Sequence, residues 1–140
     1  MIETRPLTKK ELDIIIDEAQ DSETRNLKRL VREPYEFFQR KSVAQNGIVI
    51  DKRPIYFGAV TFNESKERFE IWTIVNKGIK NQFSLYKIAK RISRQWAKTY
   101  KVIYATMEKI NFKNVEWTKR IGFIPVQETD RLITLRLGGI

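Results

Sequence analysis

The chain has 140 residues, enough for one domain with a hydrophobic core, and 41% of its residues are hydrophobic. It contains no cysteine and no histidine, which excludes disulfides, thiol nucleophiles, zinc sites and a Ser-His-Asp triad. The formal net charge of +10 indicates a surface that attracts polyanions: nucleic acid, phosphate-bearing cofactors, anionic lipid or an acidic protein.

The apolar runs are short, and their length bears on membranes and secretion. None approaches the roughly 18 residues that a membrane-spanning helix requires, so no membrane partner is expected. No charged segment followed by an apolar one opens the sequence, so we expect no secretion signal and a cytoplasmic location. We expect a single domain over residues 1–140.

The first third of the sequence predicts one short strand followed by helices. Residues 2–5 read as the strand. Thr8 and Glu11 then match the T-x-x-E pattern of a capping box, in which each side chain bonds the backbone N–H of the other residue, so a helix is predicted to begin there. Residues 23–31 and 35–43 are expected to form two more helical segments.

The middle of the sequence changes to a strand pattern. Residues 47–51, 55–62 and 69–75 are rich in β-branched and aromatic residues and are separated by polar turns, which predicts an antiparallel meander. Residues 76–82 are expected to form a loop with one glycine, Gly78.

The longest predicted helix covers residues 84–100. Its apolar face repeats with helical spacing at Leu85, Ile88, Ala89, Ile92 and Trp96. Its other side is basic and carries Lys87, Lys90, Arg91, Arg94 and Lys98. Between residues 71 and 107 there is no Asp or Glu but there are eight Lys and Arg, so this helix is the candidate contact for nucleic acid or an acidic protein; the alternative is a solvated face.

The last third predicts a strand at residues 102–107, a helix at 112–121, and strands at 123–126 and 131–137. A meander followed by β-α-β segments predicts a mixed α+β fold, with a mixed central sheet of six to seven strands and flanking helices. The β-α-β part should be right-handed and partly parallel.

The segment around the last helix carries a recognisable pattern. Asn111 precedes the helix and is typical of an N-cap, and Gly122 follows it at the position that often ends a helix. Phe123 then begins a strand. This Asn-helix-Gly-Phe spacing, with the order of elements along nearly the whole chain, resembles the GNAT superfamily of N-acetyltransferases.

The resemblance implies an acyl-CoA N-acyltransferase-like fold, acetyl-CoA as the cofactor and an amine as the substrate. In that family two parallel strands, here residues 69–75 and 102–107, splay apart and hold the pantetheine arm of the cofactor. Backbone groups near Ile74 and Val75 would orient this arm, and Asn111 would contact it.

The resemblance also implies a pyrophosphate loop ahead of the longest helix, where backbone N–H groups bind anions. The candidate residues are Lys77, Gly78, Lys80, Asn81 and Gln82. The later glycine positions of the family's loop are Lys80 and Gln82 in this chain. The alternative is a plain strand-to-helix turn with solvated lysines.

The resemblance implies candidate catalytic residues at four positions. Many family members have a tyrosine acid four residues before the glycine; this chain has Thr118, whose hydroxyl has a higher pKa and a shorter reach than a phenol. Glu70 and Glu108 are the carboxylates available as a general base, with a solvated strand residue as the alternative for each. Tyr104 is the phenol near the expected cleft, and Trp117 is expected to pack its helix on the sheet.

Two functions fit these features. The first is an acetyl-CoA-dependent N-acetyltransferase, in which an amine attacks the thioester directly and positioning supplies much of the rate. A basic enzyme would accept an anionic substrate more naturally than a polyamine. The second is a catalytically silent GNAT fold that serves as a structural, morphogenesis or binding module of a tailed phage, in the host cytoplasm or the virion; small chains of that kind share the pattern and lack the glycine-rich loop.

Overall fold

The computed structural model describes residues 1–19, 22–76 and 82–139. These residues form one seven-stranded sheet in the order β1-β2-β3-β4-β5-β7-β6. The strands are β1 (Ile2–Arg5), β2 (Ser42–Ile50), β3 (Arg53–Asn63), β4 (Arg68–Val75), β5 (Val102–Glu108), β6 (Ile124–Glu128) and β7 (Leu132–Gly138). The helices are α1 (Lys9–Ala19), α2 (Ser22–Leu30), α3 (Pro34–Lys41), α4 (Gln82–Tyr100) and α5 (Phe112–Ile121).

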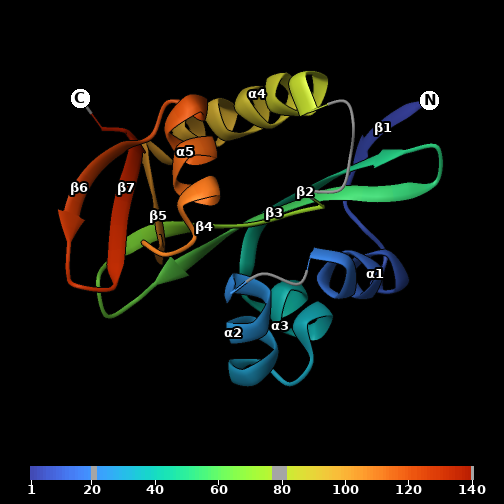
Figure 1. Cartoon of the computed structure of the whole chain (residues 1–140), viewed down its shortest axis with the longest axis horizontal. Coiled ribbons are helices and arrows are strands. Elements are labelled where there is room, and N and C mark those ends of the chain that lie inside the picture. Colours follow the sequence, from blue (N-terminus) through green and yellow to red (C-terminus); the bar gives the residue numbers. More distant parts are fainter. Residues whose placement is uncertain (20–21, 77–81, 140) are drawn as a thin grey trace.

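The sheet is the middle of three layers (Figure 1). Helices α1, α2 and α3 cover one face, where Leu12, Ile15 and Phe38 pack against Phe57 and Ile74 of the sheet. Helices α4 and α5 cover the other face and bury a second core. Each helix layer packs on a sheet face because alternate residues of each strand point to opposite sides. The predicted mixed α+β fold with a central sheet and flanking helices is confirmed.

The capping box at the start of α1 is also confirmed. The backbone N–H of Glu11 donates to Thr8 Oγ1 over 3.2 Å, and the backbone N–H of Thr8 donates to Glu11 Oε1 over 2.9 Å. The guanidinium of Arg5, on β1, donates to both carboxylate oxygens of Glu11 over 2.8 Å each. These bonds tie the start of the first helix to the edge strand of the sheet.

The structure differs from the sequence prediction between α3 and β2. The predicted helical segment 35–43 ends at Lys41, and the strand expected from Gly47 begins at Ser42. Residues from Ser42 onward pair with β3, with a bulge between Ser42 and Ala44. No pattern in the sequence indicated these first residues of β2, because Gln45 and Asn46 are polar and interrupt any apolar alternation. The strand is extended here by its pairing with β3, which is a tertiary interaction.

Helix α4 has the predicted division into an apolar and a basic side. Leu85, Ala89 and Ile92 are buried against the sheet, while Arg91 and Arg94 are exposed. The helix begins at Gln82, two residues before the predicted start. In the described part of the chain, no helix has both the length and the apolar character that crossing a bilayer demands.

The junction of β4 and β5 is the part of the fold that shapes the site. Strand β4 pairs with β3 along its whole length, from Arg68 to Val75, and β5 pairs with β7 in the same way. Between β4 and β5, which run parallel, the register holds the single pair Glu70 and Tyr104. The two strands therefore separate toward their carboxyl ends, and the splay expected there is confirmed.

Candidate functional site

The separation of β4 and β5 opens a pocket of about 210 Å³, called the inter-strand pocket here. Residues 70–75 of β4 form one wall, and residues 105–107 of β5 form the other. Helix α5 contributes Asn114, Trp117 and Thr118, while Leu27 and Phe38 reach it from α2 and α3. The pocket therefore lies between the two helix layers, with access to both faces of the sheet.

A second pocket of about 380 Å³, called the helix pocket, adjoins the first. It lies between the end of β4 and helices α4 and α5, and it is lined by Val75, Asn76, Leu85, Phe112, Lys113, Asn114, Glu116, Trp117 and Arg120. Val75, Asn114 and Trp117 line both pockets. The two hollows are thus neighbours on either side of these three residues, and together they are called the cleft here.

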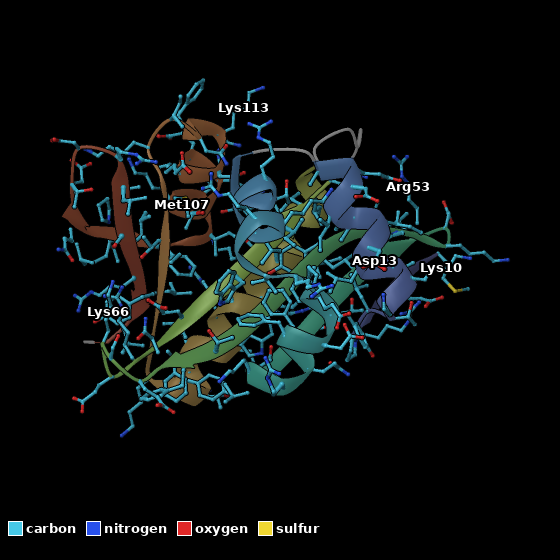
Figure 2. All side chains as sticks on the ribbon, turned by 90° about the horizontal axis from the view of Figure 1, so that it is seen from below. Lys10, Asp13, Arg53, Lys66, Met107 and Lys113 are labelled. Atoms are coloured by element: carbon cyan, nitrogen blue, oxygen red, sulfur yellow. The ribbon has the colours of Figure 1, made fainter. Side chains whose placement is uncertain are left out.

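Figure 2 looks onto the sheet from the side of α1–α3 and labels Met107 on β5 and Lys113 on α5. Met107 is buried in the wall of the inter-strand pocket, whereas Lys113 is exposed beside the helix pocket. Met107 thus gives the inter-strand pocket part of its apolar wall, and Lys113 places a cation at the helix pocket.

Lys113 and Arg120 are two exposed cations at the helix pocket that the sequence analysis did not single out. Together with Trp117 they follow the spacing i, i+4 and i+7, which places all three on one side of α5. That spacing was present in the sequence, but nothing in the sequence shows that this side faces a cleft and not bulk solvent.

Asn76, at the end of β4, is a further residue that the sequence analysis missed. It is buried, its backbone N–H donates to the Ile55 carbonyl over 2.8 Å, and its side-chain amide donates to Glu18 on α1. This residue lines the helix pocket and is held in place from two sides. A buried amide fixed in this way gives the cleft a rigid polar wall.

Trp117 was expected to pack α5 on the sheet, and it also lines both pockets. Its ring centroid lies 6.2 Å from that of Tyr56 on β3. Tyr56 is fully buried, and burial raises the pKa of its phenol well above the ordinary value, an effect that Ser93 offsets in part. Burial thus favours the neutral form of the Tyr56 phenol, the ring beside which Trp117 packs.

Thr118 lies in the wall of the inter-strand pocket, where the sequence placed a potential acid. Its hydroxyl donates to the backbone carbonyl of Asn114 over 2.7 Å, and its Oγ1 lies 3.8 Å from Met107 Sδ. The hydroxyl is thus engaged with its own helix. A catalytic role for Thr118 as an acid stays a prediction.

Glu70 lines the inter-strand pocket and is bound on both oxygens. Arg68 Nη2 lies 3.0 Å from its Oε2, and the Asn63 amide donates to its Oε1 over 3.0 Å. The Arg68 guanidinium also lies 4.6 Å from the centroid of the Tyr104 ring. The ion pair between Glu70 and Arg68 has a structural role, and a role of Glu70 as a general base stays a prediction.

Tyr104 is not among the described residues that line either pocket. It sits at the last position where β4 and β5 still pair, below the point where the gap opens. Glu108 lies at the end of β5 opposite Leu132 of β7, and it also does not line the described pockets. The structure therefore brings Glu70 and Thr118 to one pocket and leaves Tyr104 and Glu108 outside it.

The predicted cofactor-binding residues divide into three groups. Ile74 and Val75 line the inter-strand pocket, and their role in orienting a cofactor arm stays a prediction. Lys77, Gly78, Lys80 and Asn81 lie outside the described residues, and Gln82 is described only as the first residue of α4.

Asn111 occupies the N-cap position of α5, but its side chain makes no capping hydrogen bond, so that part of the prediction was wrong. Its backbone carbonyl instead accepts the N–H groups of Asn114 and Val115 over 3.0 and 3.2 Å. At the other end, Gly122 has a φ of 123°, and its N–H donates to the Lys119 carbonyl over 3.0 Å. The predicted glycine end of this helix is confirmed, since this φ is unfavourable for residues with a side chain.

The predicted partner residues of α4 are Lys87, Lys90, Arg91, Arg94 and Lys98. Lys90 is half-buried, with its ammonium 5.6 Å from the centroid of the Tyr86 ring, and the other four are exposed. Among the described residues, no ion pair involves Arg91, Arg94 or Lys98. A polyanionic partner for this surface stays a prediction.

Comparison with known proteins rests on structure alone, since no family model and no curated protein matches the sequence. An N-acetyltransferase from Staphylococcus aureus Mu50 is similar at a TM-score of 0.69 and 11% identity, over 99% of this chain and 98% of that one. The putative acetyltransferase yncA from Salmonella typhimurium, solved with acetyl-CoA, is similar at a TM-score of 0.66 and 13% identity, over 98% of this chain and 93% of that one.

A variant of the spermidine N-acetyltransferase SpeG from Vibrio cholerae is similar at a TM-score of 0.67 and 12% identity, over 98% of this chain and 93% of that one. None of these three is described as a phage protein, so the expectation of a phage module finds no support in them. At such low identity, the likeness establishes the architecture and not the activity. The mixed sheet, the splay of β4 and β5 and these three likenesses together show that this chain has the fold of the GNAT acetyltransferases.

Proposed function

We propose that the protein is an N-acetyltransferase that uses acetyl-CoA as the acyl donor and an amine as the acceptor. The observation that carries the proposal is the cleft made of the helix pocket and the inter-strand pocket, which share Val75, Asn114 and Trp117. Such a cleft accommodates a long, thin cofactor whose reactive end must lie inside the fold and whose charged end must remain at the surface.

The residues around the cleft fit this cofactor. Within the described chain, β4 pairs with β5 only at Glu70, so the β4 edge over residues 71–75 offers its backbone groups to the amides of a pantetheine arm. Lys113 and Arg120 flank the outer end, where they would contact phosphate groups. The N-terminus of α4, a helix of 19 residues, adds the partial positive charge of a helix dipole nearby.

Acetyl-CoA would supply an acyl group that is activated toward amines as a thioester. The protein's own contribution would be positioning: the β4 edge aligns the arm, and Trp117 and Met107 keep water from the inner end of the cleft. Glu70 is held by Arg68 and Asn63, and the Thr118 hydroxyl is held by Asn114. We therefore assign the rate mainly to alignment of a neutral amine, with a smaller contribution from proton transfer.

The acceptor that fits this chain is not a polyamine. Glu70 is the one carboxylate among the described residues lining the inter-strand pocket, and Arg68 compensates its charge. The protein as a whole carries a net charge of +10. A polycation would therefore meet repulsion and little local compensation, so we propose an acceptor amine on a neutral or anionic molecule.

Isothermal titration with acetyl-CoA tests the proposal directly, and we expect binding in the micromolar range. Release of free CoA in the presence of candidate amines gives the activity. Because the chain has no cysteine, a thiol reagent reports CoA without any signal from the protein. Absence of binding at millimolar acetyl-CoA to protein shown to be folded by circular dichroism would overturn the proposal.

A further inference from the structure

The helix pocket contains an aromatic side chain that packs in neither hydrophobic core. Phe112, the first residue of α5, is 67% exposed and lines this pocket beside Lys113. Resting on the proposed function, we infer that the Phe112 ring stacks on the adenine of the acyl donor. The donor class that follows is a thioester of CoA itself, and not an acyl pantetheine carried on a protein, which has no adenine.

Three residues of α5 follow one another at intervals of four: Phe112, Glu116 and Arg120. At 3.6 residues per turn, this spacing forms a row along one side of the helix. All three residues are exposed, and all three line the helix pocket. The row therefore presents an aromatic ring, a carboxylate and a guanidinium to one pocket, in this order along the helix axis.

The guanidinium end of the row lies beside the first turns of α4. The Tyr86 hydroxyl, in the second turn of α4, donates to the backbone carbonyl of Arg120. The N-terminal end of a helix attracts phosphate groups, and the first turn of α4 contains no Asp or Glu that would oppose this attraction. The pyrophosphate of the donor would therefore lie at this end of the helix pocket, near Arg120.

Phe112 lies at the opposite end of the row. Eight residues separate it from Arg120, which at 1.5 Å per residue is roughly 12 Å along the helix. A nucleoside diphosphate bridges such a span, with its phosphates at one end and its base at the other. Because every base has a π-face, an exposed aromatic ring binds it by stacking alone. The base would thus lie at the Phe112 end of the pocket.

The other charged residues of the pocket fit the middle of this nucleotide. Glu116, midway along the row, can accept a hydrogen bond from the ribose 2′-hydroxyl, which is free in CoA. Lys113 follows Phe112 in the chain and is labelled in Figure 2. CoA carries a phosphate on the ribose 3′-oxygen, close to the base, and a cation next to the stacking ring suits this phosphate.

Trp117 is the second aromatic residue among those that line the helix pocket. It is half-buried, its ring packs beside Tyr56, and it also lines the inter-strand pocket. Its position at the junction of the two pockets suits contact with the pantetheine arm. Phe112 is therefore the ring whose face is available to the base.

Isothermal titration of the full chain with three probes tests the inference without any turnover. The probes are acetyl-CoA, S-acetyl-4′-phosphopantetheine, which lacks the nucleotide, and adenosine 3′,5′-bisphosphate, which lacks the arm. For Phe112→Ala, we expect the dissociation constants of acetyl-CoA and the bisphosphate to rise about fivefold or more. The dissociation constant of the phosphopantetheine ester should not change, and in the parent protein this ester should bind more weakly than acetyl-CoA.

Two further variants at the same position separate stacking from plain apolar contact. Phe112→Tyr keeps an aromatic face and should retain the affinity of the parent protein. Phe112→Leu keeps an apolar side chain without that face and should behave as Phe112→Ala does. Since Phe112 is exposed, none of these substitutions disturbs the core, and circular dichroism confirms the fold of each variant.

Ile110→Ala is the matched control. Ile110 lies two residues before Phe112 and is 77% exposed, but it does not line the described pockets. This variant loses an exposed apolar side chain from the same segment and should bind all three probes as the parent protein does. An equal loss of affinity in Ile110→Ala and Phe112→Ala would overturn the inference.

The possible outcomes separate this inference from the proposed function. If acetyl-CoA binds and Phe112→Ala or Phe112→Leu binds it equally well, the inference is wrong and the proposed function stands. The same holds if the phosphopantetheine ester binds as tightly as acetyl-CoA. If the bisphosphate binds through Phe112 but acetyl-CoA binds no tighter, the arm contributes nothing and the proposed function is wrong, whereas the base-stacking site stands. If the folded parent protein binds none of the probes, both are overturned.

Discussion

Thr118 on α5 contacts Met107 on β5, with Oγ1 and Sδ 3.8 Å apart, in the wall of the inter-strand pocket. The same hydroxyl donates to the Asn114 carbonyl over 2.7 Å. This short side chain thus lines the inter-strand pocket, while its hydroxyl donates its hydrogen bond within its own helix. The contribution of Thr118 to the shape of the pocket can therefore be tested separately from any contribution to proton transfer.

Thr118→Val tests the proton-transfer role, because it keeps the shape and removes the hydroxyl. We expect the rate of CoA release to change by less than about threefold, since a general acid would contribute roughly 10²-fold or more. The lost bond to Asn114 should lower the free energy of unfolding by about 0.5–1.5 kcal/mol. Steady-state kinetics and urea unfolding measure the two effects, and a hundredfold loss of rate in a folded variant would make Thr118 the acid.

Lys113 and Arg120 should contribute to the affinity for CoA and not to the chemical step. The double variant Lys113→Ala and Arg120→Ala removes two cations at the helix pocket. We expect the dissociation constant of CoA to rise about tenfold or more, since charge-assisted bonds to phosphate are lost. The dependence of the affinity on salt should weaken as well.

Lys28→Ala and Lys66→Ala together serve as the control for this pair, since both lysines are exposed and neither lines the described pockets. The control has the same net charge as the double variant. If both double variants lost the same amount of CoA affinity, the net charge of the protein, and not contact at the helix pocket, would account for the loss.

Glu70 should matter more for stability than for rate. In Glu70→Gln, the carboxylate that faces Arg68 is lost, and the arginine side chain, only 16% exposed, keeps its charge without this counter-ion. We expect unfolding to become easier by about 1–3 kcal/mol. The rate of a folded sample should fall less than tenfold. Kinetics across pH distinguish the outcomes, since loss of the fall in rate at low pH, together with a hundredfold lower rate, would identify Glu70 as a base.

Acid should weaken the junction between β1 and α1. The hydrogen bonds from Arg5, with smaller contributions from Thr8, lower the pKa of Glu11 to about 2 from an ordinary value of 4.5. Because the pKa in the folded state lies below the unfolded one, this stabilisation is complete above pH 4.5 and is lost as the pH falls from there toward 2.

Urea unfolding at several pH values measures this effect. Glu11→Gln should reduce the loss of stability between pH 5 and pH 3 relative to the parent protein. Thr8→Ala, which removes the other half of the capping box, should instead lower the unfolding free energy by about 1 kcal/mol at neutral pH. If the unfolding free energy of Glu11→Gln depended on pH as that of the parent protein does, Glu11 would not be the group responsible for the loss of stability in acid.

The basic surface of α4 should bind polyanions without sequence preference. Reversal of three exposed charges, Arg91→Glu, Arg94→Glu and Lys98→Glu, should abolish retardation of a DNA duplex at low salt. Affinity of the parent protein should fall steeply as salt increases. If the reversed variant still binds, or if the parent protein does not retard DNA or RNA at low salt, the basic side of α4 is simply a solvated surface and not a binding surface.

Local patterns in the sequence were enough for several features. The capping box of Thr8 and Glu11, the amphipathic α4 and the glycine end of α5 at Gly122 are each determined by interactions within a few residues, so their patterns survive in any context. The strand β2 was placed too late, because its first residues are held by distant partners on β3.

What the sequence by itself determined is the order of elements, and with it the mixed α+β fold; the expectation that two strands would separate followed from the resemblance to the GNAT superfamily. The tertiary structure alone decided which side chains meet in the gap. It placed Glu70 and Thr118 in one pocket, left Tyr104 below the opening, and turned Lys113 and Arg120 toward a cleft. The physical reason is that strand separation and helix rotation depend on packing between residues far apart in the chain, and no local pattern records that packing.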